Sequence, residues 1–187
     1  MSSILLTPPE VEPIALAEAK HYLRVEHADD DDIIAALIAG ARIHVEALTR
    51  RALIAQTWRL VRNRWPADGR IAVFPVPLRA LAAARVCKAD GTAQALDVDA
   101  FNVDTVGGVL SLAPGVLPAP GRVAGGIELD IDAGYGEAPD DVPEPLRQAI
   151  RMLAAHWYEN RGVTGEHAAV LPQGVTALLA PFRAVSL

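Results

Sequence analysis

The chain has 187 residues, of which 51% are hydrophobic and 21% charged, and its formal net charge is −6. This composition supports a hydrophobic core, excludes wholesale disorder, and suits one domain or a small core with an inserted module. A single cysteine, Cys87, excludes an internal disulfide and a zinc site built from several cysteines. Because we find neither a signal-peptide pattern nor an apolar stretch of roughly 20 residues, we expect a soluble cytoplasmic product without a membrane span.

Residues 1–56 are predicted to be helical. A short helix is expected over residues 15–25, and a longer one follows the acidic run 29–32. The apolar residues of the longer helix recur at helical spacing: Ile34, Leu37, Ile38, Ala41, Val45 and Leu48. We expect an aspartate of the acidic run to cap this helix, and Arg42 and Glu46 to form an i,i+4 pair on its outer side.

The middle part, residues 57–135, has the period of strands. Ile127, Leu129 and Ile131 alternate with acidic residues, which is the pattern of a half-buried strand. About six such short segments are separated by Gly- and Pro-containing turns. We therefore predict a small antiparallel sheet, sandwich or barrel in this part of the chain.

The last part, residues 136–187, returns to helix and ends in a tail. The buried stripe of its long helix is predicted to consist of Leu146, Ala149, Ile150, Leu153 and Trp157. Gly162 is expected to end this helix, and residues 163–173 are expected to form a loop. The apolar tail 175–182 is too short to bury itself alone, so we expect it to dock on the domain or on another subunit.

The predicted fold class is α+β. Residues 1–56 and 136–162 form a small helical bundle of two N-terminal helices and one long C-terminal helix. An antiparallel β module, residues 57–135, is inserted into this bundle, and a docking tail follows it.

Charge is distributed unevenly along the chain. Residues 42–88 carry ten basic side chains and two acidic ones, whereas residues 89–141 carry ten acidic side chains and one basic one. The asymmetry fits ordinary solvated surfaces, and it fits equally a polarised subunit whose basic side meets the acidic side of a neighbour. A nucleic-acid binder that uses the basic stretch is a further alternative.

A search for catalytic chemistry finds no convergent set of residues. The five histidines form no HExxH pair, no phosphate-binding glycine loop is complete, and no nucleophile elbow is present. Cys87 lies in a predicted strand, where a buried structural thiol is the default. At the end of the last helix, Trp157 fits the core, while Tyr158 and Arg161 are open between a local cap and a partner contact.

Taken together, these segments resemble the head–tail connector (adaptor) family of tailed phages and gene transfer agents, in the long form with a β insertion. The N-terminal match consists of Ala41-Arg42, Glu46, Thr49-Arg50-Arg51-Ala52-Leu53 and Gln56-Thr57-Trp58. The later matches are Phe74-Pro75-Val76-Pro77-Leu78, Ala133-Gly134-Tyr135-Gly136, Val142-Pro143, Leu146-Arg147-Gln148-Ala149-Ile150, His156-Trp157-Tyr158-Glu159-Asn160-Arg161 and Leu171-Pro172-Gln173-Gly174-Val175. Two features depart from the family: Arg50 stands where many relatives have Gly, and residues 79–84 are unusually Ala-rich for a strand.

The resemblance implies a structural protein without enzymatic activity, metal or cofactor. Its partners would be the portal protein, a stopper or tail-terminator protein, and further copies of itself in a ring, usually dodecameric. The ring would extend a channel through which DNA passes without specific binding. Assembly would take place in the bacterial host cytoplasm, and the protein would then belong to the particle neck.

Two hypotheses follow for the surfaces. The acidic β part faces the channel or the basic flank of the next subunit, and the tail docks on a neighbour or on the portal. The candidate interface residues are Arg42, Arg50, Arg51, Arg59, Arg62, Tyr158, Arg161, Val175, Leu178, Leu179, Phe182 and Arg183. The alternatives are a small ligand-binding or enzymatic domain and a DNA binder with a basic patch.

Overall fold

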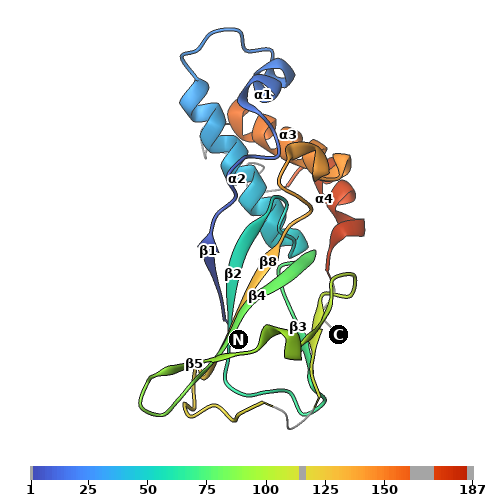
Figure 1. Cartoon of the computed structure of the whole chain (residues 1–187). Helices are drawn as coiled ribbons and strands as arrows, with labels where there is room; N and C mark the ends of the chain where they lie inside the picture. The colour runs from blue at the N-terminus through green and yellow to red at the C-terminus, as the bar shows by residue number, and fades with distance from the viewer. Residues whose placement is uncertain (1, 114–116, 161–170, 185–187) are drawn as a thin grey trace. The chain divides into compact units, whose positions relative to one another are not determined.

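The computed structural model describes residues 2–113, 117–160 and 171–184 (Figure 1). These residues belong to two compact units. The first, here called the β unit, combines residues 1–9 with residues 55–135. The second, the helical unit, combines residues 10–54 with residues 136–185. Helices and antiparallel strands occur in separate parts of the chain, so the predicted α+β class is confirmed.

The β unit contains a five-stranded antiparallel sheet with the strand order β1-β2-β8-β4-β5. Its strands, in that order, are Ser2–Thr7, Gln56–Arg62, Ile127–Ala133, Leu78–Cys87 and Ala93–Leu96. A second, three-stranded antiparallel sheet has the order β3-β7-β6. Its strands are Arg70–Ala72, Val109–Ser111 and Asn102–Asp104. A short 3-10 helix, Val98–Ala100, precedes β6.

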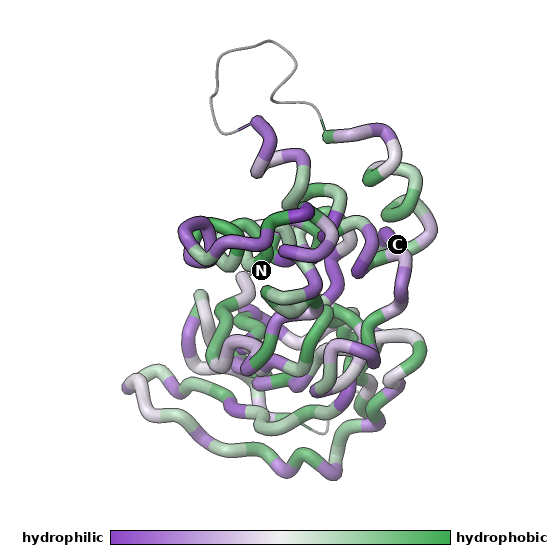
Figure 2. Tube along the Cα trace, turned by 90° about the horizontal axis from the view of Figure 1, so that it is seen from above, coloured by the Kyte–Doolittle hydropathy of each residue, from purple (hydrophilic) through white to green (hydrophobic). Residues whose placement is uncertain are grey.

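Apolar side chains from both sheets form one buried cluster, which is the core of the β unit. Leu60 of β2 and Leu129 of β8 come from the five-stranded sheet, whereas Ile71 and Leu110 come from the three-stranded sheet. All four are essentially inaccessible to solvent. Because successive residues of a strand point to opposite faces, only every second side chain of β8 belongs to this core. Figure 2 shows hydrophilic and hydrophobic residues following one another in short stretches along the chain trace.

The strands differ from the sequence prediction in three places. The helical N-terminal part was expected to begin at residue 1, and this is wrong for Ser2–Thr7, which form the edge strand β1 beside β2. The Ala-rich residues 79–84 do form a strand, because β4 lies between β8 and β5 and is fixed by pairing on both sides. The short edge strand β5 was not predicted.

The helical unit is built on two helices that pack on each other, α2 (Asp31–Thr49) and α3 (Glu144–Glu159). The predicted stripes of both helices are buried or half-buried, as the periodicity requires. The smaller helices α1 (Leu16–Leu23) and α4 (Gln173–Leu179) complete the unit. Two 3-10 helices, Pro139–Asp141 and Ala180–Phe182, precede α3 and follow α4.

The two ends of α2 are formed differently from the prediction. Asp30 occupies the N-cap position, but its side chain makes no capping hydrogen bond, because its carboxylate accepts the hydroxyl of Tyr158 instead. The helix ends at Thr49, since Arg50 adopts the left-handed conformation with φ of 55°. Glycine is the residue that usually occupies such a position after a helix. This explains why glycine would suit position 50, where the present chain has Arg50.

The C-terminal tail is helical and partly buried within its own unit. Val175 and Leu179 of α4 have no exposed surface, and α4 packs mainly on α3. Of the two expected docking places of the tail, its own domain and another subunit, these two residues occupy the first. Docking of the tail on a neighbour or on the portal stays a prediction. The predicted helix stop Gly162 and residues 163–170 of the predicted loop 163–173 lie outside the described residues. At the end of this predicted loop, Gln173 is already the first residue of α4.

Candidate functional site

One face of the five-stranded sheet carries a cluster of charges instead of apolar residues. Glu128 and Asp130 alternate with Leu129 and Ile131 along β8, so they point away from the core. The strand register places Arg59 of β2 opposite Asp130, and Arg85 of β4 opposite Glu128. These four charged residues are called the charged face below.

Asp130 is the centre of the charged face. It accepts hydrogen bonds from Arg59 Nε at 2.7 Å and Nη2 at 3.0 Å, and from Arg85 Nη1 at 2.8 Å. The residue is only 5% exposed. Burial alone would raise the pKa of Asp130, but hydrogen bonds from the two guanidinium groups outweigh it and hold this pKa below its usual range. The bonds to Asp130 likewise raise the pKa of Arg59.

The charged face changes the interpretation of the uneven charge distribution. Arg59 and Arg85 belong to the basic stretch, whereas Glu128 and Asp130 belong to the acidic stretch, and the two stretches pair within one chain. A neighbouring subunit is not needed to neutralise these charges. Arg59 was a candidate interface residue, and its observed partner is Asp130 of its own sheet.

Arg42 also has its partners within the chain. The prediction placed its pair with Glu46 on the outer side of α2, and this is wrong, because Arg42 is only 8% exposed. Its Nε donates to Glu12 and its Nη1 to Glu46, both at 2.8 Å. Burial lowers the pKa of Arg42, but the two carboxylates raise this pKa by a larger amount, so it lies above its usual value. A buried arginine with two carboxylate partners holds the chain before α1 against α2.

Three other candidate residues make local contacts. Arg51 Nε donates to the carbonyl of Phe182 at 2.6 Å, which ties the end of α2 to the C-terminal tail. Arg62 Nη2 donates to the carbonyl of Ala72, and burial lowers the pKa of Arg62. Tyr158 donates its hydroxyl hydrogen to Asp30. Of the two alternatives for Tyr158, a local contact and a contact with a partner, the described residues therefore show the local one.

The remaining candidates differ in accessibility. Val175 and Leu179 are fully buried, so their predicted place in an interface is corrected to a place in the core of the helical unit. Leu178 and Phe182 are half-buried, whereas Arg50 and Arg183 are exposed. Arg161 lies outside the described residues. For Leu178, Phe182, Arg50 and Arg183, a place in an interface stays a prediction.

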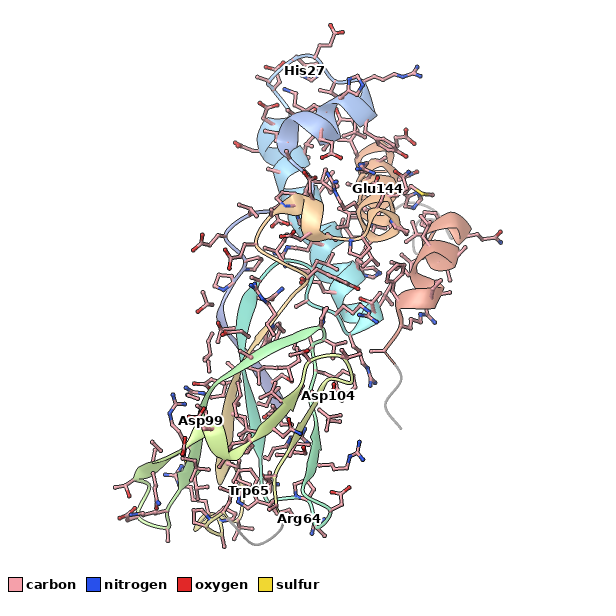
Figure 3. The ribbon with its side chains drawn as sticks, turned by 45° about the vertical axis from the view of Figure 1, so that its right-hand side comes forward. His27, Arg64, Trp65, Asp99, Asp104 and Glu144 are labelled. Atoms are coloured by element: carbon pink, nitrogen blue, oxygen red, sulfur yellow. The ribbon has the colours of Figure 1, made fainter. Side chains whose placement is uncertain are left out.

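The described part of the chain contains no group of three or more His, Cys, Asp and Glu side chains that could hold a metal ion. Two surface depressions are each lined by residues close in sequence. One is formed by residues 62–67, including Arg64 and Trp65 (Figure 3), and the other lies along α1 and the residues after it. Cys87 is buried, as expected for a structural thiol. Among the described helices, none is long and apolar enough to cross a membrane.

Comparison with solved structures identifies similar chains over the whole length of this one. A chain of the neck of an empty gene transfer agent (GTA) particle, determined with C6 symmetry, has a TM-score of 0.84 at 24% identity, with coverage of 100% of this chain and 97% of that one. A chain of the virion of a native GTA particle has a TM-score of 0.83 at 25% identity, with the same coverage. A chain of the neck of a native GTA particle, determined with C12 symmetry, has a TM-score of 0.80 at 25% identity, again with the same coverage.

The chain shares its fold with a neck component of gene transfer agent particles. The resemblance to neck connectors seen in the sequence is thus supported by structure. Neither a protein-family model nor a curated protein matches the chain.

One surface that the sequence analysis missed is an apolar face of α2. Ile33 and Ile43 are 42% and 57% exposed, and Ala36 and Ala47 between and after them are exposed as well. These four residues, here called the outer face of α2, lie opposite the buried stripe. Their spacing of three, seven and four residues is helical, so the pattern was visible in the sequence. It was overlooked because the same helix also carries the buried stripe.

Proposed function

We propose that this protein is a structural head–tail connector of a tailed phage or gene transfer agent particle. Copies of the chain form a ring below the portal, extend the DNA channel, and provide the docking surface for a stopper or tail-terminator protein. The supporting observation is the similarity to GTA neck chains, which covers 100% of this chain and 97% of theirs.

The symmetry of the related particles supports a ring of identical copies. The similar neck chains come from assemblies determined with C6 and C12 symmetry. A cyclic arrangement requires each copy to use two different surfaces, one toward each neighbour. The ring proposed for this protein is therefore a multiple of six copies, and the dodecamer expected from the family resemblance is the favoured state.

The alternative of a DNA binder with a basic patch finds less support. Of the basic stretch, Arg42, Arg59 and Arg85 are paired with carboxylates of the same chain. A side chain that already neutralises a carboxylate contributes little to the release of counterions from DNA. Passage of DNA through a channel, without specific binding, is compatible with this arrangement.

The proposed function can be tested on phage or gene transfer agent particles purified from a strain that produces them. Mass spectrometry of purified particles should find this protein, and electron microscopy should place it in the neck. Deletion of its gene should leave DNA-filled heads that carry no tails. Normal joined particles from the deletion strain, or particles that lack the protein, would refute the connector function.

A further inference from the structure

The two sheets of the β unit differ in how their edge strands are protected. An edge strand exposes backbone N–H and C=O groups that can pair with another chain, and charged side chains or prolines on the strand discourage such pairing. The three-stranded sheet carries a charge on each edge strand, Arg70 on β3 and Asp104 on β6. The five-stranded sheet ends in β1 and β5, and neither strand contains a charged residue or a proline.

Strand β1 is an open edge with exposed apolar side chains. Within the described residues it pairs only with β2, which it adjoins in Figure 1. Ile4, Leu5 and Leu6 are 50%, 41% and 41% exposed. Because successive side chains point to opposite faces, these three occupy both faces of the strand. A strand added on the free side of β1 would satisfy its backbone groups and cover apolar side chains on both faces.

Strand β5 is the opposite edge of the same sheet and matches β1 in length. The pairing of β1 with β2 is regular over residues 2–5, and the pairing of β5 with β4 is regular over residues 93–96, so each regular segment has four residues. Residues 93–95 are exposed and Leu96 is half-buried. Strands β2, β8 and β4 separate the two edges, which are therefore about 19 Å apart at roughly 4.8 Å for each strand spacing.

We propose that β1 of one copy pairs with β5 of the next copy in the ring, so that neighbouring five-stranded sheets join into one continuous sheet. This inference rests on the proposed function, because the ring supplies the second copy. Each open edge requires an extended, uncharged segment, and the opposite edge of another copy is such a segment of equal length. Two different edges on opposite sides of one sheet also meet the requirement of a head-to-tail contact between identical copies.

The topology also gives the direction of the joining strands and the face on which their side chains meet. Four successive antiparallel pairings leave β1 and β5 running in the same direction, so the joining pair is parallel. Ile4 lies opposite Arg59, and Ala95 lies opposite Arg85. Since both arginines belong to the charged face, Ile4 and Ala95 lie on the same face of neighbouring strands in the continuous sheet.

Cysteine cross-linking in assembled particles tests the contact directly. The double variant Ile4→Cys/Ala95→Cys places one thiol on each edge, and the native Cys87 is buried and contributes little background. Treatment with a short bismaleimide should give a ladder of covalent oligomers on a denaturing gel. Each single variant should give no ladder, and neither should Ile4→Cys/Asn102→Cys, whose second thiol lies on the charged edge strand β6.

Charges placed on the two edges give an independent readout. In Ile4→Glu/Ala95→Glu each glutamate lies beside an arginine of its own chain, but the two glutamates repel each other across the proposed contact. The amount of this variant in purified particles should be at least about fivefold lower than that of Ile4→Glu/Ala95→Lys, whose charges attract. The matched control Asn102→Glu/Thr105→Glu, with two exposed positions at β6, should be incorporated like wild type. Circular dichroism checks that all three variants are folded.

The outcomes separate the inference from the function on which it rests. If the wild-type protein is present in particles but the cysteine pair gives no ladder, the edge contact is wrong and the connector function stands. If the wild-type protein is absent from particles, the function fails and the contact fails with it. A ladder from Ile4→Cys/Ala95→Cys alone, together with the loss of the Glu/Glu variant from particles, supports both. Where the Glu/Glu variant does not fold, or where the two measurements disagree, the ladder decides, because it reports the distance between the two edges.

Discussion

Arg59 on β2 and Asp130 on β8 are 71 residues apart in sequence and form a bidentate ion pair. Arg59 Nε donates to Oδ1 of Asp130 at 2.7 Å, and Arg59 Nη2 donates to Oδ2 at 3.0 Å. Arg85 adds a third hydrogen bond from the other side of β8. Together these hydrogen bonds join three neighbouring strands through side chains, on the face of the sheet opposite the buried cluster of the β unit. We therefore expect the charged face to contribute to the stability of the β unit rather than to recognition.

The first prediction concerns Asp130 itself. Asp130→Asn should lower the free energy of unfolding by about 2 kcal/mol, because hydrogen bonds to charged groups contribute roughly 1.5–3 kcal/mol. Urea unfolding followed by tryptophan fluorescence would measure it, since Trp58 and Trp65 lie in the β unit. Asp99→Asn, at an exposed position, should stay within about 0.5 kcal/mol of wild type. An equal loss in both variants would contradict a special role for Asp130.

The second prediction is a dependence on pH. The pKa of Asp130 is depressed in the folded state, so its contribution is fully present above the pKa of an unfolded aspartate, about 3.9. That contribution is lost as the pH falls through the lower folded pKa. The stability difference between wild type and Asp130→Asn should thus be constant between about pH 5 and 7 and shrink below about pH 4. A difference that persists undiminished in acid would show that the pKa is not depressed.

The third prediction uses the end of α1. Arg24 has a φ of 58°, a left-handed conformation that costs a side-chain-bearing residue roughly 1 kcal/mol relative to glycine. Arg24→Gly should therefore raise the stability of the helical unit by about 0.5–1 kcal/mol. Thermal unfolding followed by far-UV circular dichroism would detect the change. Arg70→Gly is the matched control, since Arg70 lies in strand β3 and glycine weakens a strand, so this variant should be less stable.

Periodicity alone identified the long elements correctly. The stripes of α2 and α3 and the alternation in β8 are each carried by several residues, and all of them define the core. The edge strand β1 was missed because the sequence Ser-Ser-Ile-Leu-Leu-Thr has no alternation, and its structure depends on the partner strand β2. Local sequence does not contain that partner.

The surfaces were harder to predict than the core. The sequence suggested that Arg42 lies outside, because its i,i+4 partner Glu46 is local, but Glu12 from a distant segment covers it. In the same way, the pairing of Arg59 with Asp130 depends on the register between β2 and β8. Charge counts along a chain cannot show which charges are satisfied within a fold, so the polarised-subunit hypothesis could be examined only with a structure.

The last prediction concerns the C-terminal helix α4, for whose apolar residues the sequence predicts a docking surface. Leu179 is fully buried, so Leu179→Ala should destabilise the helical unit by about 2–4 kcal/mol through lost burial and the cavity left behind. Leu178 is half-buried in the same helix, so Leu178→Ala should cost clearly less, about 1 kcal/mol. Chemical unfolding monitored by circular dichroism compares the two variants. Equal small losses would mean that α4 is not held against α3 in solution, and they would return Leu179 to the set of residues available for a partner.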